Sequence, residues 1–98
     1  MNHNPNDLIA CIDVDGTLVK VANAGDPGVI YIRNPYTGIE RARTILMPNV
    51  NLLLQYKAQG YYIRVWSHGG SLWAKAVVEA LSLEDVVDSV EAKPSKLV

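Results

Sequence analysis

Short runs of apolar residues alternate with turn-forming residues along the chain. Residues 8–12 are apolar or small without a break and lead directly into acids, which is typical of a strand that is buried on both faces and ends abruptly. Residues 29–33 and 39–46 are rich in β-formers and flank a turn that ends in Gly38, so they predict a β-hairpin. Residues 20–28 contain two glycines and a proline and are predicted to form the loop before it.

Helix and strand patterns alternate after the hairpin. Pro48 suits the first turn of a helix, and Gly60 is well placed to end it. An apolar stripe along this helix is formed by Val50, Leu53 and Leu54. Residues 61–66 are rich in aromatic and β-branched residues, which favours a second strand, and residues 86–90 predict a brief third strand.

A second helix is predicted between these two strands, with Ser71 as its N-cap. Its apolar positions recur at helical spacing, at Trp73, Val77, Ala80 and Leu81. We interpret Trp73 as a core residue rather than a platform for a ligand. The whole order predicts an α/β fold with a Rossmann-like parallel sheet, crossover helices and a β-hairpin flap at about residues 29–46.

Composition narrows the domain organisation and the function classes. The 98 residues match the common size of one domain, predicted over residues 8–98, after a polar and flexible leader at residues 1–7. Hydrophobic residues make up 49% of the chain and charged residues 19%, which excludes a disordered protein. The net charge of -1 does not indicate binding to nucleic acid. The single cysteine, Cys11, lies in the first apolar run and is predicted to be a small core residue.

The sequence shows neither a membrane-spanning segment nor a secretion signal. No apolar run is long enough to span a membrane, and the polar start resembles no signal peptide. The prediction is therefore a cytoplasmic protein with no membrane partner.

Candidate chemistry lies where the predicted parallel strands end. Asp13 and Asp15 follow the first strand, Ser67 follows the second, and carboxyl ends of parallel strands meet at one edge of a sheet. Carboxylates beside an apolar core are costly unless a cation or phosphate chemistry uses them. The alternatives are a structural turn for the two acids and for Ser67, and an ordinary solvated side chain for Lys93.

These residues together resemble the haloacid dehalogenase-like superfamily of phosphotransferases. Three of that family's four signature motifs occur in order, and they are Asp13-Val14-Asp15-Gly16-Thr17, then Ser67, then Lys93 before Pro94. The resemblance implies that Asp13 is the nucleophile that forms an aspartyl-phosphate and that Asp15 is the general acid and base. A carboxylate can serve in both roles. It also implies a small member without a cap domain, since no insertion large enough for one is found.

The resemblance further implies a cofactor, a substrate and their ligands. Mg²⁺ would be held by the Asp13 carboxylate and the Asp15 backbone carbonyl, because this ion prefers oxygen ligands. Thr17, Ser67 and Lys93 would bind the phosphate of a phosphorylated substrate, with help from backbone N–H groups after Ser67. The predicted function is a Mg²⁺-dependent phosphatase or phosphotransferase that acts on a phosphate ester. His68 is left out of the catalytic set. Arg41 and Arg43 share one face of the hairpin. We interpret them as solvated, and contact with a substrate phosphate is the alternative.

The family's fourth motif, a pair of acids that completes the magnesium site, has no counterpart before the sequence ends at Val98. The sheet is therefore expected to be incomplete, with one side of the first strand open to a second copy or a partner chain. An omitted following segment, completion by another chain and a degenerate member would each account for this. The strand-like pair Leu97-Val98 favours the first two. The alternative function is a catalytically weak or inactive binding and assembly module that a partner chain completes.

Overall fold

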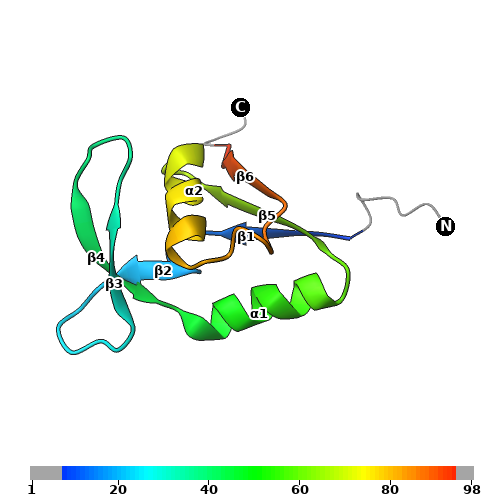
Figure 1. The fold of residues 1–98 in the computed structure, drawn as a ribbon, viewed down its shortest axis with the longest axis horizontal. Helices are drawn as coiled ribbons and strands as arrows, with labels where there is room; N and C mark the ends of the chain where they lie inside the picture. The colour runs from blue at the N-terminus through cyan, green and yellow to red at the C-terminus, as the bar shows by residue number, and fades with distance from the viewer. Residues whose placement is uncertain (1–7, 95–98) are drawn as a thin grey trace.

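The computed structural model describes residues 8–94. Its elements in chain order are β1 (Ile9–Asp13), β2 (Val19–Val21), β3 (Val29–Arg33), β4 (Glu40–Ile45), α1 (Met47–Ala58), β5 (Tyr62–Ser67), α2 (Ser71–Ala80) and β6 (Ser89–Ala92). They form an α/β fold with one parallel and one antiparallel sheet (Figure 1). The predicted leader at residues 1–7 and the strand start at residues 97–98 lie outside the described range. Within that range, no helix has the length and apolar character needed to cross a membrane.

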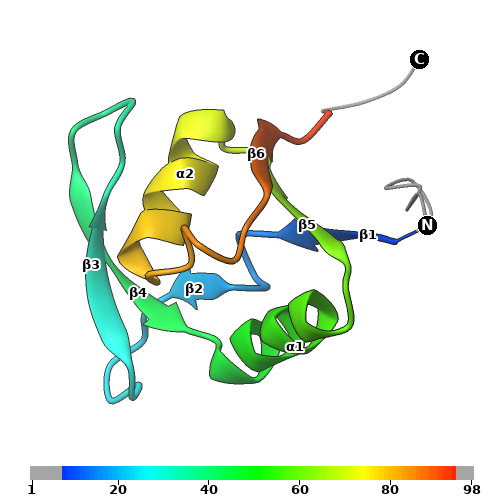
Figure 2. The same ribbon diagram turned by 45° about the vertical axis from the view of Figure 1, so that its right-hand side comes forward.

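The parallel sheet has the strand order β1-β5-β6, with β5 in the centre. Residues alternate along β5 between buried and half-buried, and Ile63, Val65 and Ser67 are the buried ones. One face of the sheet therefore carries the apolar core, which continues into Leu53 of α1 and Val77 of α2. In both ribbon views α2 lies between the parallel and the antiparallel sheet (Figure 2). The prediction of an α/β fold with a parallel sheet is confirmed.

The first strand is not buried on both faces, and the prediction for Cys11 is wrong. Ala10 is buried, but Cys11 is exposed. Cys11 lies in register with Arg64 of β5, so both belong to the sheet face opposite to the one that carries the core. Among residues 8–94, β1 pairs with β5 on one side and has no strand on the other. An unbroken apolar run in the sequence therefore became a half-buried edge strand.

The predicted hairpin is present, and a third strand joins it. β3 and β4 pair antiparallel around the turn at residues 34–38. β2 pairs with the other side of β4, which places Val19 opposite Ile45. The prediction of a loop over residues 20–28 is therefore wrong at its start. Hydrogen bonding to β4 holds residues 20 and 21 in a strand, although turn-forming residues follow closely.

Asp26 holds the rest of this loop against β4. Its Oδ2 atom accepts hydrogen bonds from the Asn23 N–H at 3.0 Å, the Lys20 Nζ at 3.0 Å and the Thr44 hydroxyl at 2.8 Å. These donors, the Asn23 N–H first, lower the pKa of Asp26 from 3.8 to about 2. The loop is thus closed by a carboxylate that must stay ionised.

The two helices occur where the sequence predicts them, with local differences. α1 has Pro48 in its first turn and buries Val50 and Leu53, but Leu54 is 40% exposed, so the predicted stripe is wrong at that residue. In α2, Ser71 is the first helical residue and makes no capping bond, because Gly70 is the N-cap. The buried face of α2 is Trp73, Ala74, Val77 and Val78, and the predicted core position Ala80 is exposed.

The third parallel strand starts three residues later than predicted. Val86 and Val87 donate their N–H groups to the Leu83 carbonyl and so belong to a turn. The chain meets β5 at Asp88, whose N–H donates to the Ile63 carbonyl at 2.8 Å and whose Oδ2 accepts the Ile63 N–H at 2.7 Å. The prediction of a strand at residues 86–90 is therefore replaced by β6, Ser89–Ala92.

Candidate active site at the ends of the parallel strands

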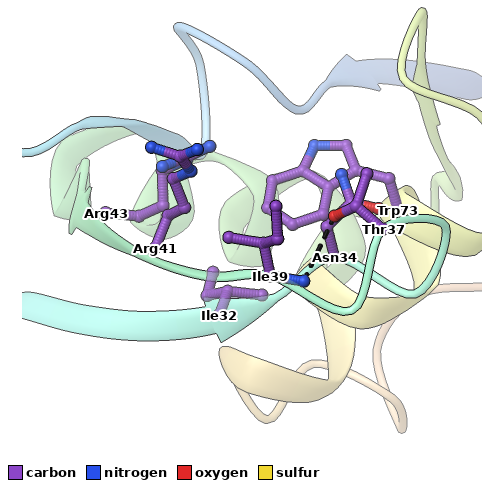
Figure 3. A pocket seen from close by; sticks show the side chains of 7 residues that line it. All are labelled: Ile32, Asn34, Thr37, Ile39, Arg41, Arg43 and Trp73. Atoms are coloured by element: carbon purple, nitrogen blue, oxygen red, sulfur yellow. Dashed lines mark hydrogen bonds between the residues drawn. The ribbon is translucent and has the colours of Figure 1, made fainter.

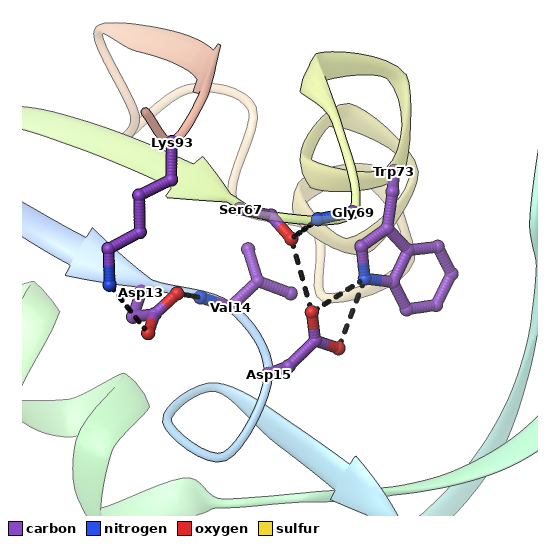
Figure 4. Close-up of polar contacts among 7 residues, drawn as sticks. All are labelled: Asp13, Val14, Asp15, Ser67, Gly69, Trp73 and Lys93. Atoms are coloured by element: carbon purple, nitrogen blue, oxygen red, sulfur yellow. Dashed lines mark hydrogen bonds and ion pairs between the residues drawn. The ribbon is translucent and has the colours of Figure 1, made fainter. Parts of the chain in front are cut away.

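The three parallel strands deliver predicted site residues to one edge of the sheet. Asp13 is the last residue of β1, and Ser67 is the last residue of β5. Lys93 directly follows β6, and its N–H donates to the Ser67 carbonyl at 2.8 Å, which continues the pairing of the two strands. Asp15 lies beneath Ser67 in the loop after β1 (Figure 4). Four of the five predicted site residues are therefore neighbours.

The Asp13 carboxylate is held at one oxygen and faces a cation at the other. Its Oδ1 accepts the N–H of Val14 at 2.9 Å. Its Oδ2 lies 3.4 Å from Lys93 Nζ, and the two side chains are 35% and 31% exposed. An ion pair this exposed adds at most about 1 kcal/mol to stability. Its main effect is to place one positive charge beside an accessible carboxylate.

The Asp15 carboxylate has only neutral hydrogen-bond partners among the described residues. The Ser67 hydroxyl donates to Oδ2 at 3.1 Å, and Trp73 Nε1–H donates to Oδ1 at 3.1 Å and to Oδ2 at 3.3 Å. Ser67 is fully buried and also accepts the Gly69 N–H at 2.9 Å. The end of β5 and the first turns of α2 thus orient the second acid.

Trp73 is the site residue that the sequence reasoning missed. Its interpretation as core is correct, since only 4% of it is exposed. However, a buried indole N–H needs a partner, and here it finds the Asp15 carboxylate. The signal was available in the sequence, because Trp73 comes soon after Ser67 at the same edge of the sheet.

The loop that follows Asp13 is a tight turn anchored from two sides. Val14 and Leu18 are fully buried, and the Leu18 N–H donates to the Val14 carbonyl at 2.9 Å. Asn49 of α1 donates its side-chain N–H to the Thr17 carbonyl at 2.9 Å. The Thr17 hydroxyl has no hydrogen-bond partner within residues 8–94, so its role in phosphate binding stays a prediction.

The hairpin reaches the start of α2 through Tyr36, a second contact that the sequence reasoning missed. The Tyr36 hydroxyl accepts the Leu72 N–H at 3.2 Å. Gly69 likewise donates its N–H to Ser67 Oγ. These two backbone donors after Ser67 are therefore engaged within the protein in this structure, and their role in phosphate binding stays a prediction.

The expected magnesium ligands are oxygen atoms, the type that Mg²⁺ prefers, but residues 8–94 supply only two of them. No group of three or more His, Cys, Asp or Glu side chains comes together in the part of the chain that the structure describes. The Asp13 side chain is 35% exposed, although its Oδ2 faces Lys93 Nζ, and no backbone N–H of residues 8–94 donates to the Asp15 carbonyl. Both are hard oxygen ligands, and Mg²⁺ usually keeps several waters. Both expected oxygen ligands are thus present, with Lys93 already facing the Asp13 carboxylate.

Comparison of the chain with protein-family models, with curated proteins and with solved structures finds no match.

Proposed function

We propose that this protein is a Mg²⁺-dependent phosphatase or phosphotransferase that acts on a phosphate ester through an aspartyl-phosphate at Asp13. The observation that supports it is the pairing of Asp13 with Lys93 at the strand ends, beside an Asp15 held by Ser67 and Trp73. In this proposal the parallel sheet is a Rossmann-like core of the haloacid dehalogenase type. The β3–β4 hairpin serves as its flap, and no cap domain lies within residues 8–94.

The different surroundings of the two acids support different roles for them. Asp13 faces an ammonium group, whereas Asp15 is bonded by a hydroxyl and an indole N–H. Two carboxylates in unlike surroundings are typical of a site in which one is the nucleophile and the other transfers protons. We therefore assign the attack to Asp13 and the proton transfer to Asp15.

The reaction proceeds in two displacements. An Asp13 oxygen attacks phosphorus, the bond between phosphorus and the leaving oxygen breaks, and the Asp15 carboxyl group gives its proton to that oxygen. The Asp15 carboxylate then removes a proton from water, whose oxygen attacks phosphorus and releases phosphate and the free Asp13 carboxylate. Lys93 and Ser67 offset charge on the phosphoryl oxygens.

Asp13 and the Asp15 carbonyl would hold Mg²⁺ in this site. When bound, the ion offsets the repulsion between an anionic nucleophile and an anionic substrate. Titration of metal-free protein with Mg²⁺ should therefore raise phosphatase activity, and EDTA should remove the gain.

The test of the proposal is hydrolysis of p-nitrophenyl phosphate by the full chain and by Asp13→Asn. Loss of a covalent nucleophile should lower kcat by a factor on the order of 10³ or more. Asp85→Asn is the matched control, because Asp85 is an exposed acid in the turn before β6. Equal activity of the two variants, with both shown to be folded by circular dichroism, would exclude Asp13 as the nucleophile.

A second candidate function, a binding and assembly module completed by a partner chain, is favoured by the open edge of β1. A hollow of about 280 Å³ along this edge is lined by Ile9, Ala10, Cys11, Ile12, Tyr56 and Tyr61. An unpaired strand offers backbone donors and acceptors to another chain. Sedimentation velocity over a range of concentrations tests this, and a monomer that turns over phosphate esters would speak against it.

A further inference from the structure

A cavity of about 160 Å³ lies between the hairpin and α2, beside the candidate active site (Figure 3). Arg41 and Arg43 of β4 line one part of it, and the Trp73 indole lines another. Ile32 and Ile39 supply apolar walls between them. The cavity is smaller than the roughly 300–1,000 Å³ of pockets for drug-sized ligands. It therefore suits one substituent of a ligand rather than a whole ligand.

The two guanidinium groups belong to the inner face of the hairpin. Arg41 and Arg43 are two residues apart on one strand, and Arg41 lies opposite Ile32 in the register of β3 and β4. The Arg43 guanidinium lies over the Trp73 ring, 5.5 Å from its centroid, and its Nη1 donates to the Ala42 carbonyl at 3.1 Å. One of the two charges is thus oriented before any ligand binds.

These positive charges have no carboxylate partner among residues 8–94. The ion pairs in this range are Lys20–Asp26, Lys57–Asp88, Arg64–Glu91 and Lys93–Asp13. Neighbouring like charges on one face of a strand repel each other. An anionic group in the cavity would remove that repulsion, and guanidinium groups match the planar, bidentate geometry of carboxylate and phosphate.

Trp73 connects the cavity to the chemistry. The same indole that lines the cavity donates its N–H to the Asp15 carboxylate. Under the proposed function Asp15 protonates the leaving oxygen, so the leaving group lies on the Asp15 side of the phosphate. A substituent of that leaving group is what the cavity would receive.

We infer that the cavity binds a second anionic group, carried by the leaving group of the substrate. The substrate class is then a phosphate monoester whose alcohol bears another phosphate or a carboxylate. This inference rests on the proposed function for the orientation of the substrate. The presence of an anion site is argued from the cavity, its two arginines and Trp73.

The experiment compares α,ω-alkanediol bisphosphates of two to six carbons with alkyl monophosphates of the same length, and with ω-carboxyalkyl phosphates. For the best length, kcat/KM should exceed that of the matched monophosphate by roughly tenfold or more, as expected for a charge-assisted contact. The bisphosphate and carboxylate series together identify which anion the cavity prefers. Equal kcat/KM for the monophosphates and for both series with a second anionic group, at every length, would overturn the inference and leave the proposed function standing.

Arg41→Gln should reduce this preference to near unity. Arg41 is exposed, so its substitution should leave the fold intact, which thermal unfolding checks. Arg33→Gln is the matched control, because Arg33 is the neighbour of Ile32 on β3 and so belongs to the opposite face of the hairpin. A preference that survives Arg41→Gln would contradict the assignment of the anion to this cavity.

Calorimetry on Asp13→Asn separates the two proposals, because it needs no turnover. The bisphosphate should bind this variant roughly tenfold more tightly than the matched monophosphate, and the added Arg41→Gln change should remove the difference. If no ester is hydrolysed but this difference is found, the proposed function fails and the anion site stands. Equal affinities of Asp13→Asn for the bisphosphate and the monophosphate would exclude the anion site, whether or not the native chain hydrolyses esters.

Discussion

Replacing Gly70 with alanine should disturb the contact between the hairpin and α2. Gly70 has φ +99° and ψ 163°, a backbone region that is essentially restricted to glycine. A Cβ atom there would overlap the Tyr36 hydroxyl and come within 2.8 Å of Tyr36 Cζ. Tyr36 cannot retreat without losing its hydrogen bond to the Leu72 N–H.

The expected cost has two parts that can be estimated separately. The backbone strain of a residue with a Cβ in this region is about 1–3 kcal/mol. Displacement of Tyr36 forfeits one hydrogen bond, about 0.5–1.5 kcal/mol. Gly70→Ala should therefore lower the free energy of unfolding by about 1.5–4.5 kcal/mol. Gly25 is the matched control, because it has φ +84° but open space around it, so Gly25→Ala should show strain alone.

Urea unfolding followed by tryptophan fluorescence measures both variants, each alone and combined with Tyr36→Ala. Removal of the Tyr36 ring should relieve the steric part, so Gly70→Ala should then cost about 1 kcal/mol less than it does in the native chain. The penalty of Gly25→Ala should be the same in both backgrounds. If Tyr36→Ala leaves the Gly70→Ala penalty unchanged, the hairpin is not held to α2 in the way described.

Three further substitutions address the site and the loop. Trp73→Phe removes the N–H donor to Asp15 and should lower kcat/KM for p-nitrophenyl phosphate about tenfold; an unchanged pH profile and rate would show that the bond does not serve catalysis. Lys93→Met should change the urea midpoint little, because the ion pair with Asp13 contributes less than about 1 kcal/mol to stability. The same substitution should slow hydrolysis by a factor on the order of 10². A normal rate would show that Lys93 is not part of the active site. The pKa of Asp26 is depressed from 3.8 to about 2, so its contribution to stability is present above pH 3.8 and is lost as the pH falls toward 2. Asp26→Asn should therefore lose less stability than the native chain between pH 5 and 2, and parallel urea-midpoint curves over this range would contradict the role of Asp26.

The sequence by itself determined the elements whose signals are local. Turn residues delimit the hairpin at Gly38, Pro48 and Gly60 mark the ends of α1, and an apolar run with β-branched residues identifies β5. The meeting of Asp13 and Ser67 also followed from sequence, because parallel strands joined by crossovers place their carboxyl ends at one edge. Covalent order and backbone geometry were sufficient for these predictions.

The tertiary structure alone decided which side chains meet across that framework. Cys11 is exposed because the second face of β1 is uncovered within residues 8–94, and β2 exists because β4 offers it a partner. Two contacts join segments that are far apart in the chain: the hydrogen bond from Trp73 to Asp15 and the packing of Tyr36 against Gly70. Such contacts depend on how whole elements pack, and packing is not encoded in the spacing of apolar residues along any one element.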